Sequence, residues 1–475
     1  MLETIHVLRN RLEELEHLTV PDPTRIYLSP PYASGSQGSQ SPDLADLDFL
    51  NLTQRTSPTN INMPEPPTDL IASLLDMFLE RFVNSGYFFL RPSQFRESAL
   101  LILPFGHQDR PSPALLTAVY LWGSVLCGVT PNDTYTPDSF LACVLQNIPQ
   151  DLARMDGNPQ LVVETIQAEV LLSLYFLHIA DPVRGRYHAS AAASIAFGAD
   201  LHLIRSPQHH PIYPPFTLHA PLPPEQNTAE ESIRIGAFWA AIIVNNLWAG
   251  VAGSPSPIPY TINVDSPWPS SSYAGATITK FFDGNDAHGS SSMALLTKAS
   301  LLLERIIAFS ARTAGPPDPT SLASLDHRLH TFQVSLPPVP GMHILLLTHA
   351  LVDLAIIRLH APYMRTSDSA RSKCLTAAAR IVVGVGAVSN PDGARNTDPM
   401  FGPIFAGVAS VYMDELQALA PHSGRRAQVE AREIEMRLGR LMSAMASLAA
   451  YSPLIAAYAT KYVAVGIAAR VSSEG

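Results

Sequence analysis

Apolar residues recur at helical spacing in one segment after another from Thr68 to the end of the chain. The clearest segment starts after Pro66 and Pro67, where Thr68 is expected to cap a helix at its N-terminus. The apolar side chains of this helix fall on one stripe, formed by Leu70, Ile71, Leu74, Leu75, Phe78, Leu79 and Phe82. Further helices are predicted at Pro113–Leu126, Leu161–His178, Arg186–Leu203, Glu231–Val251, Ala294–Phe309, Met342–Leu359, Ala370–Val388 and Val429–Ala449.

Strand patterns are scarce, and the breaks between these segments carry proline and glycine, which end helices without starting hairpins. No fixed period of 20 to 50 residues relates the segments, which disfavours a regular solenoid. The sequence therefore predicts an all-α fold, with one irregular multi-helix domain over residues 68–475.

The first 67 residues have a different character. Over residues 1–19, Ile5, Leu8, Leu12 and Leu15 follow the a/d spacing of a short coiled-coil-like helix. A helix of this length is marginal in water, so a dimerisation segment and a frayed amphipathic helix are equally consistent with the pattern. Residues 20–67 are rich in Pro, Ser and Gly and have no periodic apolar face, so we expect a disordered linker there.

Charge and cysteine content argue against direct DNA binding by this chain. The 31 Lys and Arg against 41 Asp and Glu give a net charge of −10, and no three basic residues are consecutive. The three cysteines, Cys127, Cys143 and Cys374, are too far apart for a disulfide framework or a zinc ribbon. We therefore expect no cofactor and no metal in this chain.

The sequence does not open with a charged-then-apolar secretory signal, which favours an intracellular location. The most apolar stretch, Ile235–Gly253, carries Asn245 and Asn246 at its centre. Amides are costly at the centre of a membrane span, so we predict a buried helix here and no membrane segment.

Motifs that suggest an enzyme fail in their details. The glycines within Ile381–Ser389 imitate a dinucleotide-binding turn, but a helical stripe continues into them where a strand is required. His209 and His210 lie in a proline-rich loop without further ligands at metal spacing, and His188 and His202 form no recognisable metal motif. A nucleophile elbow and an H-E-x-x-H motif are both absent from the sequence, so no catalytic residue is predicted.

Glu169 and Gln167 stand within an otherwise apolar helical segment. A buried carboxylate or amide needs a hydrogen-bonding partner, so we expect a neighbouring helix or an arginine, from among Arg184, Arg186 and Arg205, to supply it.

A series of segments in a fixed order then suggests a family. Gly86–Phe95 reads GYFFLRPSQF, and it is followed by Pro113–Gly123, Ile166–Leu172, Gly185–His188, Ala199–His202, Ala237–Trp248 and Gly253–Ser256. Together they resemble the middle homology, or regulatory, region of fungal zinc-cluster transcription factors. Each segment alone is degenerate, and the order of the series carries the resemblance.

The resemblance implies a transcription regulator in the nucleus that controls RNA polymerase II transcription. Members of the family combine a six-cysteine zinc cluster, a linker, a short coiled coil and this helical domain. Here no such cysteine run is present, so DNA contact and zinc are expected only in an N-terminal domain missing from this chain, encoded just upstream. Ile5, Leu8, Leu12 and Leu15 match the dimerisation segment, which implies a homodimer.

The implied partners are transcriptional co-regulators and a small-molecule effector bound in a cleft between helices. Two alternatives stay open: a helical small-molecule-binding protein, and an interaction scaffold without DNA binding.

Overall fold

Helices account for all the regular structure in the described part of the chain, which confirms the all-α prediction. The computed structural model describes residues 63–128, 134–206, 222–258, 262–286, 288–312, 318–339, 343–386, 397–421 and 424–462. They belong to one compact unit, residues 61–475. The predicted coiled-coil-like helix with Ile5, Leu8, Leu12 and Leu15, and residues 20–62 of the predicted linker, lie outside the described residues.

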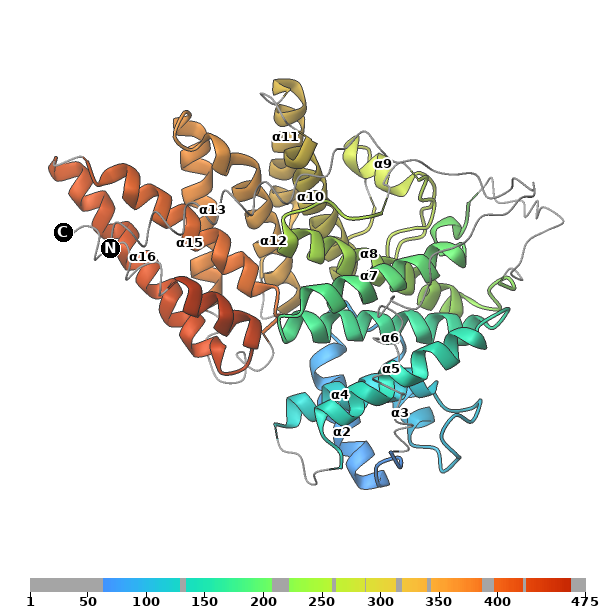
Figure 1. Ribbon diagram of the computed structural model, residues 1–475. Helices are drawn as coiled ribbons and strands as arrows, with labels where there is room; N and C mark the ends of the chain where they lie inside the picture. Colours follow the sequence, from blue (N-terminus) through green and yellow to red (C-terminus); the bar gives the residue numbers. More distant parts are fainter. Residues whose placement is uncertain are drawn as a thin grey trace, which may run out of the picture. The chain divides into compact units, whose positions relative to one another are not determined.

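Figure 1 labels the helices of this unit along the chain. Their bounds are α2 Thr68–Phe82, α3 Pro92–Ala99, α4 Pro113–Cys127, α5 Pro137–Ala153, α6 Pro159–His178, α7 Pro182–Gly198, α8 Thr228–Ala252, α9 Thr277–Phe282, α10 Ser292–Arg312, α11 Pro319–Ser335, α12 His343–His360, α13 Asp368–Gly386, α15 Phe401–Leu419 and α16 Arg425–Ala449. Short 3-10 turns, η3 at Leu201–Leu203 and η4 at Ala361–Tyr363, follow α7 and α12.

A row of largely buried helices forms the core. Helix α4 packs against α6, α6 against α8, α8 against α10 and α10 against α12 (Figure 1). The remaining helices flank this row, with α5 against α4 and α6, α7 against α6 and α8, and α11 and α13 against α12. Since a helix in the row has neighbours on most sides, it is apolar nearly all round, and in α6 every residue from Leu161 to Leu177 is buried.

Three helices of this row, α6, α8 and α12, are long and apolar enough to cross a membrane by length and composition alone. In the protein, 94%, 89% and 83% of their most apolar windows are buried against other helices. The asparagines in α8 have partners there: Asn245 donates to the Ala189 carbonyl of α7 at 2.6 Å, and Asn246 donates to Ser300 Oγ of α10 at 3.2 Å. The stretch Ile235–Gly253 is thus the buried helix that was predicted.

Several predicted boundaries were wrong. Helix α2 starts at Thr68, but Pro67 occupies the N-cap position and no side chain caps the helix. The helix predicted at Arg186–Leu203 runs instead from Pro182 to Gly198. Asp181 caps its start by accepting from Arg184 N at 3.0 Å, and the chain turns after it because Asp200 adopts a left-handed φ of 56°.

Helices α3, α5, α9, α11 and α15 were not predicted. Most of α11 is exposed, so it has only a thin apolar stripe, and α5 contains Pro149. The glycine run that imitates a dinucleotide-binding turn is helical as far as Gly386, the last residue of α13, so its first part is no strand.

Candidate functional site

A cleft of about 580 Å³ opens between α3, the loop after it, and the first turns of α6 and α8. We call it the α3/α6/α8 cleft. Its volume falls within the roughly 300 to 1,000 Å³ of typical small-molecule sites. Part of its wall is apolar, with Leu90, Phe95, Val163 and Ile233, and part consists of the primary amides Gln94, Gln108, Gln160, Gln226 and Asn227.

A buried carboxyl group lines this cleft. Glu164 of α6 is only 7% exposed, and it accepts hydrogen bonds from Ser112 N at 2.7 Å and from Gln160 Nε2 at 2.9 Å. Burial raises the pKa of Glu164 to about 7, although both hydrogen bonds act in the opposite direction. At neutral pH the group is therefore divided between its charged and its neutral form.

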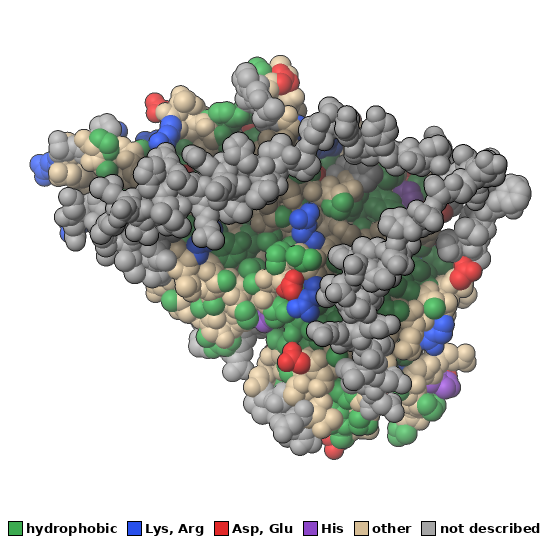
Figure 2. Space-filling view, viewed as in Figure 1, with side chains coloured by type: hydrophobic (Ala, Val, Ile, Leu, Met, Phe, Trp, Pro, Cys, Tyr) green, Lys and Arg blue, Asp and Glu red, His purple; other side chains and the backbone are tan. Residues whose placement is uncertain are grey.

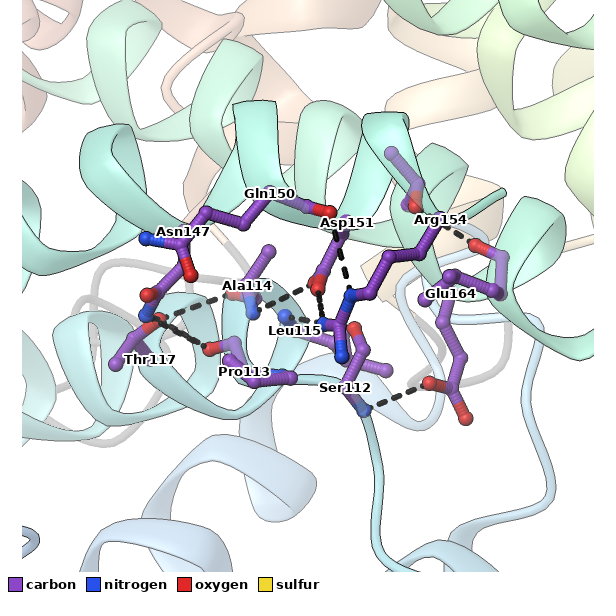
Figure 3. Close-up of polar contacts among 12 residues, drawn as sticks. Ser112, Pro113, Ala114, Leu115, Thr117, Asn147, Gln150, Asp151, Arg154 and Glu164 are labelled. Carbon is purple, nitrogen blue, oxygen red and sulfur yellow. Dashed lines mark hydrogen bonds and ion pairs between the residues drawn. The ribbon is translucent and has the colours of Figure 1, made fainter. Parts of the chain in front are cut away.

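Glu164 also joins the cleft to the start of α4 (Figure 3). The residue that donates to it, Ser112, is the N-cap of α4, and the Ser112 side chain accepts from Leu115 N. On the other side of the same helix end, Asp151 of α5 accepts from Ala114 N at 3.0 Å and pairs with Arg154 at 2.6 Å (Figure 3). A ligand that changes the charge or the hydrogen bonds of Glu164 therefore acts directly on the end of a core helix.

A buried arginine forms another part of the cleft wall. Arg234 of α8 is 3% exposed, and its terminal nitrogens donate to the Pro223 carbonyl at 2.9 Å and to Glu230 at 2.5 Å. Its Nε–H is buried and has no hydrogen-bond partner among the described residues. An unsatisfied buried donor costs about 1 to 3 kcal/mol, and this atom is shielded from the cleft as it is from solvent.

The segment Gly86–Phe95, the first of the series found in the sequence, leads into α3 and contributes Leu90, Arg91, Gln94 and Phe95 to the cleft. Gln167 of α6 fixes the backbone of this segment. Its Oε1 accepts from Phe89 N at 3.1 Å, and its Nε2 donates to the Tyr87 carbonyl at 3.0 Å. The unusual amide in α6 thus positions one wall of the cleft.

The partner of Glu169 is a histidine of a neighbouring helix, the first of the two sources that were expected, and it is none of the three arginines. Its Oε2 lies 2.6 Å from Nδ1 of His188 on α7, and both side chains are buried. Arg184 instead pairs with Asp181, and Arg205 pairs with Glu231. The expectation that a neighbouring helix supplies the partner is confirmed.

Gly185 of α7 allows close packing against α8. A Cβ atom at this position would lie 2.0 Å from Cζ2 of Trp248. The Trp248 indole in turn donates to Ser173 Oγ of α6 at 2.8 Å. Together with the Gln167 and Glu169 contacts, this packing joins the segments found in the sequence into one structural block.

The remaining candidates from the sequence do not converge on a site. His202 packs against Phe197, with ring centroids 5.0 Å apart, and His209 and His210 lie outside the described residues. Within the described ranges, no three His, Cys, Asp or Glu side chains come together in a group that could hold a metal ion. No histidine or cysteine is among the described residues that line the α3/α6/α8 cleft.

Basic side chains are scattered on the described part of the face shown in Figure 2, where Lys and Arg lie in separate spots with Asp and Glu between them. The described part of that face therefore offers no continuous basic surface for a phosphate backbone.

Sequence reasoning missed Glu164 and Arg234. A charged residue inside an apolar helical segment was a signal for Glu164, and the spacing Glu230 to Arg234 was a signal for an ion pair on one helix face.

No protein-family model matches this sequence, and no curated protein is significantly similar to it.

Proposed function

We propose that this chain is the effector-responsive regulatory part of a transcription regulator of the fungal zinc-cluster type, and that the α3/α6/α8 cleft receives the effector. The observation that carries the proposal is Glu164, because it lines the cleft and also accepts from the N-cap residue of α4. A ligand in the cleft then has a direct mechanical connection to the helical core. The order of the sequence segments that resemble the family, and their packing into one block, support the regulatory part of the proposal.

In this proposal the protein acts in the nucleus and contacts DNA and zinc only through a domain outside this chain. It pairs through the segment with Ile5, Leu8, Leu12 and Leu15, and the helical unit recruits co-regulators. The net charge of −10 fits a chain that reaches DNA indirectly. We propose no catalysis, since the cleft is lined by carboxylates, amides and apolar groups without a nucleophile–base pair among the described residues.

A ligand-binding protein without a role in transcription is the second candidate, and the same cleft supports it. A tethering experiment separates the two. The full chain is fused to an unrelated DNA-binding domain, and transcription is measured from a reporter that carries the matching site in a fungal host. We expect the fusion to change reporter output at least severalfold relative to the DNA-binding domain alone. Output equal to that of the DNA-binding domain, at equal protein level in the nucleus, favours the second candidate.

A further inference from the structure

The charges in the α3/α6/α8 cleft are largely balanced within the protein. Arg234 is paired with Glu230 at 2.5 Å and with Glu225 at 3.3 Å. Arg91 and Asp109, both exposed residues of the lining, bring opposite charges. The lining therefore carries both signs, and a phosphate or carboxylate drawn to Arg91 also meets the carboxylates of Asp109, Glu164 and Glu230.

Two of the three helix N-termini at the cleft, those of α6 and α8, are capped by side chains, whereas α3 begins after Arg91 and has no side-chain cap. Asn158 accepts from Leu161 N at the start of α6, at 3.1 Å. Asn227 accepts from Ala229 N and Glu230 N at the start of α8, at 3.0 and 2.9 Å. Since these side chains satisfy backbone donors that an anion would otherwise use, the ends of α6 and α8 add little attraction for phosphate.

The groups that are free to bind are exposed primary amides. The side chains of Gln94, Gln108 and Gln226 are exposed in the cleft lining and make no hydrogen bond within the described residues. Each primary amide both donates and accepts, which matches a hydroxyl group, itself both donor and acceptor.

The apolar part of the wall limits the ligand further. Val163 and Ile233 offer aliphatic surface suited to the C–H groups of a saturated ring or chain. Phe95 is 5% exposed and packs edge-on against Phe88, at 5.4 Å between centroids, so its ring face is not free to stack on a planar aromatic ligand.

We infer that the α3/α6/α8 cleft binds an uncharged polyhydroxylated molecule, either a cyclic sugar or an acyclic polyol. This inference rests on the proposed function, in which the same cleft is the effector site. The ligand's hydroxyl groups bond to the free glutamine amides, and one hydroxyl donates to the Glu164 carboxylate. Each carboxylate oxygen of Glu164 has one partner in the protein and accepts a second hydrogen bond without losing it.

The test is direct binding to the full chain, measured by ligand-observed NMR and equilibrium dialysis. Sugars and polyols raise the thermal stability of most proteins by exclusion from the surface, so a shift in unfolding temperature alone is not sufficient. The panel contains glucose, xylose and a disaccharide as cyclic members, mannitol and glycerol as acyclic members, and glucose 6-phosphate as the charged counterpart of glucose. Tighter binding of the cyclic members indicates that the ligand is a sugar, and tighter binding of the acyclic members indicates a polyol.

Variants locate the binding. Gln226→Ala and Gln94→Ala each remove one free amide, and each is expected to weaken binding about five-fold, the effect of one hydrogen bond. Ala229→Trp places a large side chain in the cleft lining and is expected to abolish binding. Gln150→Ala and Ser232→Trp change exposed residues outside the lining and are expected to leave binding unchanged.

Two results overturn the inference. Glucose 6-phosphate bound as tightly as glucose, or more tightly, contradicts an uncharged ligand. No binding by any neutral member of the panel at millimolar concentration also contradicts it. The proposed function fails separately, if the tethered chain has no effect on transcription. A charged or aromatic compound that binds and is lost in Ala229→Trp keeps the effector site and replaces only the ligand class.

Discussion

Replacing Glu164 by glutamine tests whether ionisation of this buried carboxyl group lowers the stability of the folded protein. The introduced side chain has nearly the same shape, and its carbonyl oxygen still accepts from Ser112 N, while Gln160 turns its amide to pair with the new NH₂ group. The substitution therefore removes the ionisable group and retains the packing and the helix cap.

The expected magnitude follows from the pKa. Folding raises the pKa of this carboxyl group from the usual 4.5 to about 7. Each pKa unit corresponds to about 1.4 kcal/mol, so the fully ionised group lowers the free energy of unfolding by roughly 3 kcal/mol. The folded state binds the proton more tightly than the unfolded state between these two values, so stability falls as the pH rises from about 4.5 to about 7. Below this window the cost is absent, and above it the cost is complete.

A second buried carboxyl acts in the same window. Burial raises the pKa of Glu304 on α10 to about 7 as well. From pH 5 to pH 8 the wild-type protein is therefore expected to lose stability through the ionisation of both Glu164 and Glu304. The Glu164→Gln variant is expected to lose only the part due to Glu304. At pH 5 the two proteins should agree within about 1 kcal/mol, and at pH 8 the advantage of the variant should be larger than at pH 5 by about 1 to 3 kcal/mol.

The assay is urea unfolding at pH 5, 6, 7 and 8, with Glu97→Gln as the matched control because Glu97 is an exposed residue of α3. The control should follow wild type at every pH. Parallel curves for wild type and Glu164→Gln would refute the reasoning, and so would a variant that is less stable than wild type at pH 8.

Three further substitutions test other parts of the account. Gly185→Ala places a Cβ atom 2.0 Å from Trp248 and is expected to destabilise the fold by about 1 to 3 kcal/mol in urea unfolding. In the control Gly198→Ala, on the same helix, the new Cβ atom meets nothing within 4 Å, so stability should change by less than about 1 kcal/mol. Equal effects of the two substitutions would contradict the packing argument. His188→Ala leaves the Glu169 carboxylate buried without its partner and should cost about 3 to 5 kcal/mol, against almost nothing for exposed Tyr187→Ala. The double substitution Leu8→Glu and Leu12→Glu should abolish self-association in analytical ultracentrifugation; an unchanged oligomeric state removes the dimerisation role of that segment.

The sequence predicted best those helices that the core surrounds. Helices α6, α8 and α12 are apolar nearly all round because each has neighbours on several sides, so their long apolar runs stand out. Helix α11 was missed because only two of its residues, Leu329 and Phe332, are buried, and two apolar positions are too few for a recognisable pattern. Prediction from one sequence thus favours buried helices over flanking ones.

The partners of buried polar groups were harder to predict than the groups themselves. Glu169 stood out as a carboxylate in an apolar segment, but its partner His188 follows from how α6 and α7 pack against each other, which local spacing does not fix. The α3/α6/α8 cleft was beyond reach for the same reason, since Gln94, Glu164 and Arg234 come from helices far apart in the chain. Only the fold brings them to one place.

The central claim is that occupancy of the α3/α6/α8 cleft controls the regulatory output of this chain. The most direct measurement compares reporter transcription from three tethered chains: wild type, Ala229→Trp, whose new side chain fills the cleft, and Ser232→Trp on the exposed side of the same helix. We predict that Ala229→Trp changes output at least threefold relative to wild type, at equal protein level and unfolding temperature, while Ser232→Trp matches wild type. Identical output from all three chains would contradict the claim.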